Sequence, residues 1–174
     1  MPETELQVKN WIEIALKYRG KTYIEYRGPN LGNEPLNGFD CSGYVQFVMK
    51  EAGVPLPINP ATGKEIRHTD EFFDLFGIFI QEQALQRGDF IFVSRNGVKP
   101  THIAIYLGDE RVIHATGRET GKVYLSDLER LRQRPIIFDP TKNEQQLYFS
   151  NPIGFKRPSI RIGRYQKVLE LDNL

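Results

Sequence analysis

Residues 38–53, with the sequence GFDCSGYVQFVMKEAG, decide how this chain folds. Asp is a preferred residue immediately before a helix and Gly immediately after one, so Asp40 and Gly53 bound a helix that begins at Cys41. A stripe of apolar residues at helical spacing predicts one buried face; it consists of Tyr44, Val45, Val48 and Ala52. We therefore expect a buried helix that carries Cys41 in its first turn.

Helices are expected before this segment and strands after it. One helix is predicted from Thr4 to about Tyr18, where Thr4 and Gln7 resemble a capping box, and another from about Glu65 to Leu75. Loops rich in Gly, Pro and Asn are predicted at 27–38 and 54–63. From Gly88 the apolar period changes to that of strands, predicted at 89–94, 101–107, 111–116 and 122–125, with a short helix at 126–131 and strands near 146–149 and 153–156. This order predicts an α+β domain with an antiparallel meander.

The composition favours one globular domain, residues 1–174, without a nucleic-acid partner. A chain of 174 residues with a formal net charge of +1 has a core of ordinary size and no strongly basic surface. No apolar stretch approaches the ~20 residues of a membrane helix, and the first twenty residues lack a signal-peptide core. As written, the chain is expected in the cytoplasm, unless it is delivered by a phage, exported by another route or trimmed.

The single cysteine is expected to be a nucleophile. A thiol in the first turn of a helix faces unpaired backbone N–H groups and the positive end of the helix dipole, and both favour the thiolate. Ser42 and Gly43 keep its surroundings small enough for a substrate carbonyl to approach. A nucleophile needs a base and the base needs an orienting partner, and His102 and His114 both fall in the predicted meander.

The register of one hairpin decides whether the two histidines meet. If a three-residue turn at residues 108–110 places Leu107 opposite Arg111, His102 and His114 lie on one face as diagonal neighbours, with Cβ atoms ~7 Å apart. A two-residue turn would place them on opposite faces. Because Ala104 and Val112 share the face of the histidines, we expect that face to stay open for a substrate.

A zinc site is the rival use of one cysteine and two histidines. Structural zinc ligands usually include two that are close in sequence, whereas Cys41, His102 and His114 are widely spaced and have no adjacent carboxylate. We therefore predict no metal and no cofactor. His68 lies in a polar stretch and is expected to be an ordinary exposed histidine.

Four blocks in this order resemble the NlpC/P60 family of cysteine peptidases. Residues 38–46, GFDCSGYVQ, resemble the family's nucleophile signature, and residues 88–93, GDFIFV, resemble the strand before its histidine. Residues 102–108, HIAIYLG, are similar to the strand that carries that histidine, and residues 113–115, IHA, to the next strand. Residues 20–28 resemble the stretch before the nucleophile loop. The match covers about residues 5–130; residues 131–174 match weakly, as C-terminal strands and a tail.

The resemblance implies a papain-like fold and hydrolysis of peptide bonds in bacterial cell-wall stem peptides, usually between D-glutamate and a diamino acid. It implies that Cys41 is the nucleophile, His102 the base and His114 the group that orients His102. We expect Tyr23, Ser42 and Asp40 to serve oxyanion or substrate binding. Tyr26 competes with Tyr23 for the role of the oxyanion tyrosine.

Two other functions stay open at this point. The same three groups could serve an amidase, an acyltransferase or a deamidase that acts outside the cell wall. A domain that binds cell-wall peptide without cleaving it is the other alternative, although such a domain would be expected to lack one of the three groups. The sequence does not predict the oligomeric state.

Overall fold

The structure is a computed structural model that describes residues 10–94, 99–117, 120–132, 134–135, 149–150, 152–162, 165–169 and 171. The helices are α1 (Trp11–Lys17), α2 (Cys41–Glu51), α3 (Thr69–Leu75), the 3-10 turn η1 (Glu82–Ala84) and α4 (Leu128–Arg132). The strands are β1 (Asn33–Glu34), β2 (Gly38–Phe39), β3 (Ile58–Asn59), β4 (Lys64–Glu65), β5 (Ile78–Ile80), β6 (Phe90–Val93), β7 (His102–Gly108), β8 (Arg111–Thr116), β9 (Lys122–Asp127), β10 (Arg134–Pro135), β11 (Phe149–Ser150), β12 (Pro152–Arg157), β13 (Ser159–Ile162) and β14 (Tyr165–Val168).

The segment that was expected to decide the fold forms α2. Asp40 precedes the helix with extended backbone, and its carboxylate accepts a hydrogen bond from Gly43 N at 2.8 Å. All four residues of the predicted apolar stripe are fully buried. Gly53 ends the segment at φ 78°, a conformation that glycine adopts without steric cost. The prediction of a buried helix with Cys41 in its first turn is confirmed.

The helices before and after α2 are shorter than predicted. α1 begins at Trp11, because the side chain of Asn10 accepts a hydrogen bond from Ile12 N at 3.0 Å and caps the helix there. The predicted capping box at Thr4 lies outside the described residues. α3 begins at Thr69, because the Glu71 carboxylate caps the backbone N–H of His68 at 2.8 Å.

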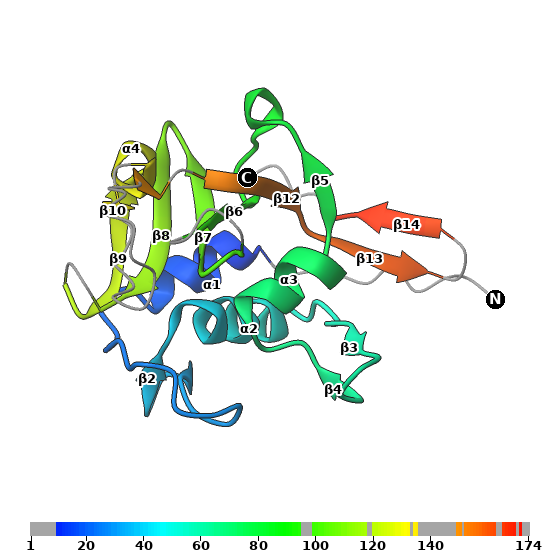
Figure 1. The fold of residues 1–174 in the computed structure, drawn as a ribbon, viewed down its shortest axis with the longest axis horizontal. Helices are drawn as coiled ribbons and strands as arrows, with labels where there is room; N and C mark the ends of the chain where they lie inside the picture. The colour runs from blue at the N-terminus through cyan, green and yellow to red at the C-terminus, as the bar shows by residue number, and fades with distance from the viewer. Residues whose placement is uncertain are drawn as a thin grey trace, which may run out of the picture.

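The strands form one six-stranded antiparallel sheet in the order β5-β12-β6-β7-β8-β9. β6 to β9 pair with their neighbours in the chain, so the predicted meander is confirmed. β12 instead inserts between β5 and β6. Figure 1 shows α1 and α2 beside the middle of this sheet, α4 near its β9 end, and the β13–β14 hairpin projecting beyond its β5 end. The mixed helix and antiparallel-sheet architecture agrees with the predicted fold class.

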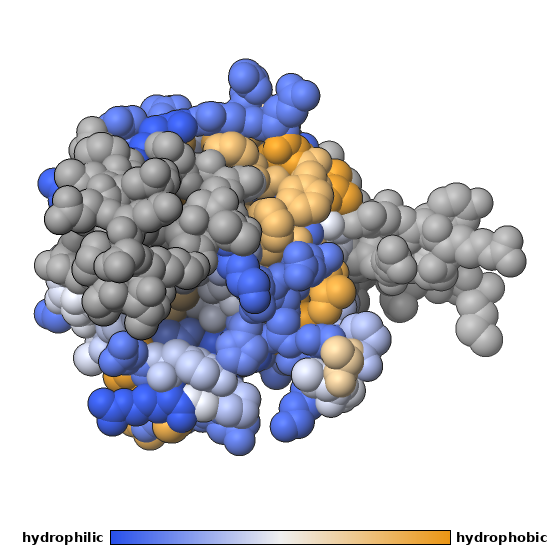
Figure 2. Space-filling view, in the orientation of Figure 1, coloured by the Kyte–Doolittle hydropathy of each residue, from blue (hydrophilic) through white to orange (hydrophobic). Residues whose placement is uncertain are grey.

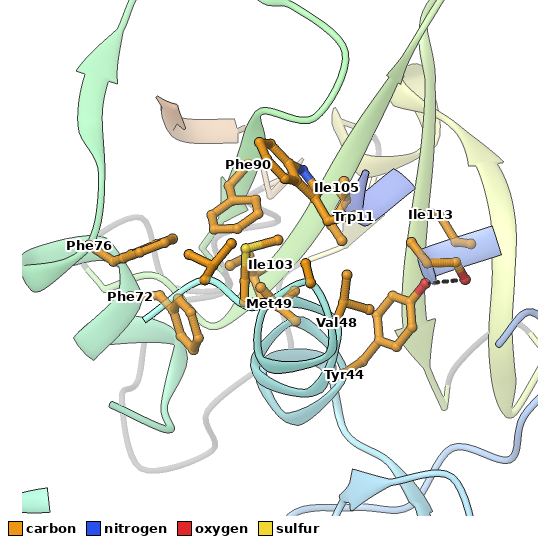
Figure 3. Close-up of a cluster of buried hydrophobic side chains, with 14 of the residues drawn as sticks. Trp11, Tyr44, Val48, Met49, Phe72, Phe76, Phe90, Ile103, Ile105 and Ile113 are labelled. Carbon is orange, nitrogen blue, oxygen red and sulfur yellow. Dashed lines mark hydrogen bonds between the residues drawn. The ribbon is translucent and has the colours of Figure 1, made fainter. Parts of the chain in front are cut away.

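Apolar side chains bury both faces of the sheet. Ile103, Ile105 and Ile113 lie in the larger cluster, together with residues of all three longer helices (Figure 3). Ala104 and Val112 lie in the second cluster with Leu128 and Leu131 of α4. This second cluster consists of Ile91, Val93, Ala104, Tyr106, Val112, Leu128, Leu131 and Phe155. The expectation that the face of Ala104 and Val112 stays open was therefore wrong, because α4 packs on it and both residues are fully buried.

The hairpin β7–β8 reaches the expected register by an unexpected turn. Gly108 pairs with Arg111 across a two-residue turn, which alone would reverse the faces. A β-bulge between Tyr106 and Gly108 restores the phase, so Tyr106 opposes Val112 and Ile105 opposes Ile113. His102 and His114 consequently share a face, as predicted, although the predicted three-residue turn was wrong.

Exposed apolar surface gathers at the β5 end of the sheet. Figure 2 shows an orange area there, in the region of α3 and β5, where Phe79 is 62% exposed and Leu75 is 39% exposed. β5 has three residues, and a short edge strand offers little backbone for pairing with another chain. Within the part of the chain that the structure describes, no helix is both long and apolar enough to cross a membrane.

Candidate active site

The cysteine lies where three segments of the chain meet. Cys41 is the first residue of α2, and its side chain remains partly exposed. Its Sγ atom lies 3.7 Å from the Thr69 hydroxyl at the start of α3 and 4.0 Å from the Thr101 carbonyl oxygen just before β7. The Ile103 backbone also forms a hydrogen bond with the thiol. The sulfur therefore contacts the backbone on both sides of His102.

The Cys41 sulfur contacts β7 beyond the last residue that pairs with β8. β7 and β8 pair from the turn as far as Ile105 and Ile113, and Ile103 lies beyond that last pair. In a continuous ladder the Ile103 backbone would bond a residue of β8. The Cys41 thiol provides a partner for it instead. The first residue of α2 is thus bonded to the sheet through Cys41 Sγ, the same atom that would carry out the chemistry.

The resting thiol is less acidic than the sequence suggested. Burial of the thiol raises its pKa above the ordinary value, and the neighbouring Asp40 carboxylate raises it further. Hydrogen bonds from Thr69 and from the backbone of Ile103 and Ser42 lower the pKa, but by less. The helix start was expected to favour the thiolate, whereas burial and the Asp40 carboxylate act in the opposite direction. An adjacent base has to accept the proton.

The two histidines form a buried pair. His102 Nε2 and His114 Nδ1 are 2.6 Å apart and share a hydrogen bond, with the ring centroids 4.9 Å apart. His114 is fully buried and His102 is 6% exposed. Because one ring nitrogen of His102 is used in this bond, its Nδ1 is the nitrogen that can exchange a proton with another group. This arrangement suits a base and its orienting partner.

Asp40 and Ser42 belong to a buried polar cluster around Arg67. Arg67 Nη1 donates to Asp40 Oδ1 at 2.9 Å and to Ser42 Oγ at 3.1 Å, and Nη2 also bonds Asp40 Oδ2. Both charged side chains are about 95% buried, with 5% side-chain exposure each. Arg67 Nη2 donates as well to the Leu31 carbonyl at 2.6 Å, which ties the preceding loop to the cluster. Asp40 therefore caps the backbone at the helix start, and the Ser42 hydroxyl bonds Asp40 and Arg67. A role of either residue in binding substrate remains a prediction.

The sequence analysis missed Arg67 and Thr69. Thr69 is the first residue of α3 and Arg67 lies two positions before it, so 28 and 26 positions separate them from Cys41 in the sequence. One signal was available: a buried Asp at a helix start requires a cation, and Arg67 directly precedes a helix-capping segment. That signal does not say which of the chain's basic residues is the partner.

The two candidate tyrosines lie in different places. Tyr23 pairs with Phe39 in an isolated bridge, and its ring lies against Gly117, just after β8. The Arg67 guanidinium lies over the Tyr26 ring, with Arg67 Cζ 5.5 Å from the ring centroid. The Tyr26 hydroxyl is 3.3 Å from His68 Nε2. Tyr26 therefore adjoins the start of α3, and the choice between the two for the oxyanion remains a prediction.

His68 is only partly exposed, whereas the sequence predicted an ordinary exposed histidine. Its ring packs edge-on against Tyr26, with centroids 4.8 Å apart. Its backbone begins α3 next to Thr69. Across the residues that the structure describes, no group of three His, Cys, Asp or Glu side chains could hold a metal ion.

Comparison with known proteins identifies relatives of this chain. Residues 28–134 match the pattern of the NlpC/P60 family. The chain is 32% identical over 84 residues to the gamma-D-glutamyl-L-lysine dipeptidyl-peptidase of Bacillus cereus, an alignment that covers 47% of this chain and 22% of that protein. Another relative, 29% identical over 100 residues, is the peptidoglycan endopeptidase RipB of Mycobacterium tuberculosis, an alignment that covers 58% of this chain and 36% of that protein. The chain spans between 22% and 30% of the length of the first curated relatives that it matches.

Solved structures share the fold. A lipoprotein-like NLP/P60 family protein from Staphylococcus aureus superposes with a TM-score of 0.51 at 31% identity, covering 74% of this chain and 37% of that one. RipD from Mycobacterium tuberculosis, described as a non-catalytic NlpC/p60 domain protein, superposes with a TM-score of 0.53 at 20% identity, covering 85% of this chain and 94% of that one. The fold by itself therefore does not distinguish an enzyme from a binding protein.

Proposed function

The chain belongs to the NlpC/P60 family, and from this premise we propose that it is a cysteine endopeptidase that hydrolyses an amide bond in bacterial cell-wall stem peptides. One observation carries the proposal. The Cys41 thiol contacts the backbone on both sides of His102, and the His102 ring is hydrogen-bonded to a buried second histidine, His114. A domain that only bound peptide would have no need of this buried histidine pair beside a thiol.

The raised pKa of the thiol dictates the order of proton transfer. Cys41 Sγ attacks the scissile carbonyl carbon while its proton passes to His102, and the carbonyl oxygen becomes an oxyanion. The imidazolium form of His102 shares its Nε2 proton with His114 Nδ1, which fixes the ring and stabilises the charge. The Cys41 backbone N–H and a tyrosine, Tyr23 or Tyr26, are proposed to donate to the oxyanion.

The second half of the reaction returns the site to its starting state. His102 gives its proton to the leaving amine, the carbon–nitrogen bond breaks, and an acyl group remains on the sulfur as a thioester. His102 then removes a proton from water, which attacks the thioester. The product carboxylate departs and the sulfur regains its proton. No metal or cofactor takes part in these steps.

The proposed bond is that between D-glutamate and a diamino acid. A relative that is 32% identical over 84 residues is named for the gamma-D-glutamyl-L-lysine linkage, which supports this choice. Amidase, acyltransferase and deamidase activities would use the same three groups on other substrates. The two possibilities differ in their products, and products can be measured.

Digestion of purified peptidoglycan, followed by mass spectrometry of the released fragments, tests the proposal. The wild-type protein is expected to release fragments cut after D-glutamate, and Cys41→Ala is expected to release none while its circular dichroism spectrum is unchanged. His102→Ala should lower kcat by at least about a hundredfold, as expected for loss of a general base. Cleavage by Cys41→Ala at the wild-type rate would refute the assignment. Intact peptidoglycan together with hydrolysis of unrelated amides would refute the substrate.

A further inference from the structure

Tyr124 lies face to face with the buried histidine of the pair. In the antiparallel pairing of β8 with β9, His114 is directly opposite Tyr124. Their ring centroids are 5.1 Å apart and the ring planes differ by 27°, so the two rings are stacked. Tyr124 is half-buried. One face of the His114 ring is therefore covered by an aromatic plane.

This contact bears on the orientation of the His114 ring. Rotation of an imidazole about its last side-chain bond is soft, so backbone placement alone does not fix the ring plane. The hydrogen bond to His102 at 2.6 Å requires Nδ1 to point at Nε2 within a narrow range of angles. A stacked ring on one side restricts rotation out of that plane. The negative face of an aromatic ring also favours positive charge shared across the pair when His102 is protonated.

The sequence analysis gave Tyr124 no role beyond a strand residue. A simple cross-strand pair would add to stability and leave the histidine hydrogen bond unaffected. The two roles can be separated, because Val123 lies next to Tyr124 on the same strand, is fully buried on the opposite face in the larger core, and pairs with Ala115 rather than with a histidine.

We propose that Tyr124 is a positioning residue that holds the His114 ring in the plane where it bonds His102, an inference that rests on the proposed cysteine-peptidase function. The stacked face acts through His114 and does not touch the substrate. An aromatic side chain is required, and the tyrosine hydroxyl is not.

Proton NMR of the protein without substrate tests this directly. The imidazole N–H in so short a hydrogen bond should give a downfield resonance that exchanges slowly with water. In Tyr124→Leu we expect this resonance to broaden or disappear, while in Tyr124→Phe and in Val123→Ala it should persist. Tyr124→Ile, which places a β-branched residue with high strand propensity at this position, replaces the leucine variant if that variant does not fold.

Kinetics give a second readout that a structural role would not move. Tyr124→Leu should lower kcat by about tenfold with KM unchanged within about twofold, because a misoriented base slows the chemical step and not substrate binding. Tyr124→Phe should keep kcat and KM at their wild-type values. Val123→Ala should lower the thermal midpoint without changing kcat. An unchanged N–H resonance in Tyr124→Leu would overturn the inference. A loss of kcat in Val123→Ala as large as that in Tyr124→Leu would overturn it as well. The NMR result stands whether or not peptidoglycan is cleaved, so failure of the proposed function remains distinguishable.

Discussion

Replacing Arg67 with Met should destabilise the protein more than a typical surface substitution. The guanidinium bonds both Asp40 carboxylate oxygens, Ser42 Oγ at 3.1 Å and the Leu31 carbonyl at 2.6 Å, and Arg67 is 4% exposed. Removing one partner of a buried ion pair leaves the other charge without compensation, at about 3–5 kcal/mol. For a chain of this size, that loss lowers the thermal midpoint by on the order of 10 °C.

The assay is urea-induced unfolding followed by circular dichroism, on the wild type and on three variants. In Asp40→Asn the amide oxygen can still accept the capping hydrogen bond from Gly43 N, so the helix start is retained. The double variant with Arg67→Met removes both charges together, and buried pairs replaced in this way are often tolerated. We therefore expect the double variant to be more stable than Arg67→Met alone, which gives a coupling free energy of at least about 1 kcal/mol.

A loss below about 1 kcal/mol in Arg67→Met would refute the reasoning, since that is the value of an exposed pair. Equal losses in the single and double variants would also refute it, because the damage would then not come from the uncompensated carboxylate. Activity provides an independent check. Asp40 directly precedes Cys41, so kcat should fall in Arg67→Met even at temperatures where the variant is fully folded.

Three further predictions follow from single side chains. Burial lowers the pKa of Lys156 from 10.5 to about 8, so between pH 8 and 10.5 the unfolded chain binds a proton that the folded chain has released. In urea titrations, the free energy of unfolding of the wild type relative to Lys156→Met should therefore rise with pH across that window. A difference that does not change with pH would contradict the assignment. A Cβ at position 43 would collide with the backbone carbonyl of Gly32, whereas a Cβ at position 53 would meet open space and be strained only by the positive φ of the backbone. Gly43→Ala should therefore lower the thermal midpoint more than Gly53→Ala. The reverse order would show that the loop carrying Gly32 can move. Burial and the Asp40 carboxylate raise the pKa of the Cys41 thiol, so the rate of alkylation by iodoacetamide should increase only in alkaline solution. Asp40→Asn should shift this increase in rate to lower pH. Rapid alkylation of the wild type at pH 6 would contradict the prediction.

Local signals were sufficient where neighbours in sequence determine the structure. α2 is bounded by its own capping residues, and the predicted strand 111–116 has the bounds of β8 because turns lie on both sides. The turn before β8 was misread for a physical reason. A two-residue turn of this kind needs positive φ at both central residues, and here Asp109 has φ 49° and Glu110 has φ 57°. Glu rarely adopts that conformation, so the sequence favoured a longer loop.

Pairing between distant segments was beyond a local interpretation. β12 inserts between β5 and β6, although more than fifty residues separate it from each of them, and no periodicity in the sequence encodes that choice. The same limit explains why Arg67 and Thr69 were missed. Their contacts with Asp40 and Cys41 arise from the packing of α3 against the start of α2, and that packing is a property of the assembled fold.

The acidity of Cys41 shows why the magnitude of an effect, and not its sign alone, has to decide a prediction. A helix start stabilises a nearby negative charge by about 0.3–1 kcal/mol, which is less than one pKa unit. Burial can shift a pKa by as much as about 3–5 units in the other direction, and here it is the largest cause acting on the thiol. In the proposed mechanism, the position of Cys41 directs the sulfur at a substrate and provides backbone donors, whereas the histidine pair removes the proton. On the proposed function, damage to the orientation of His102 and His114 should lower kcat far more than changes to the helix dipole.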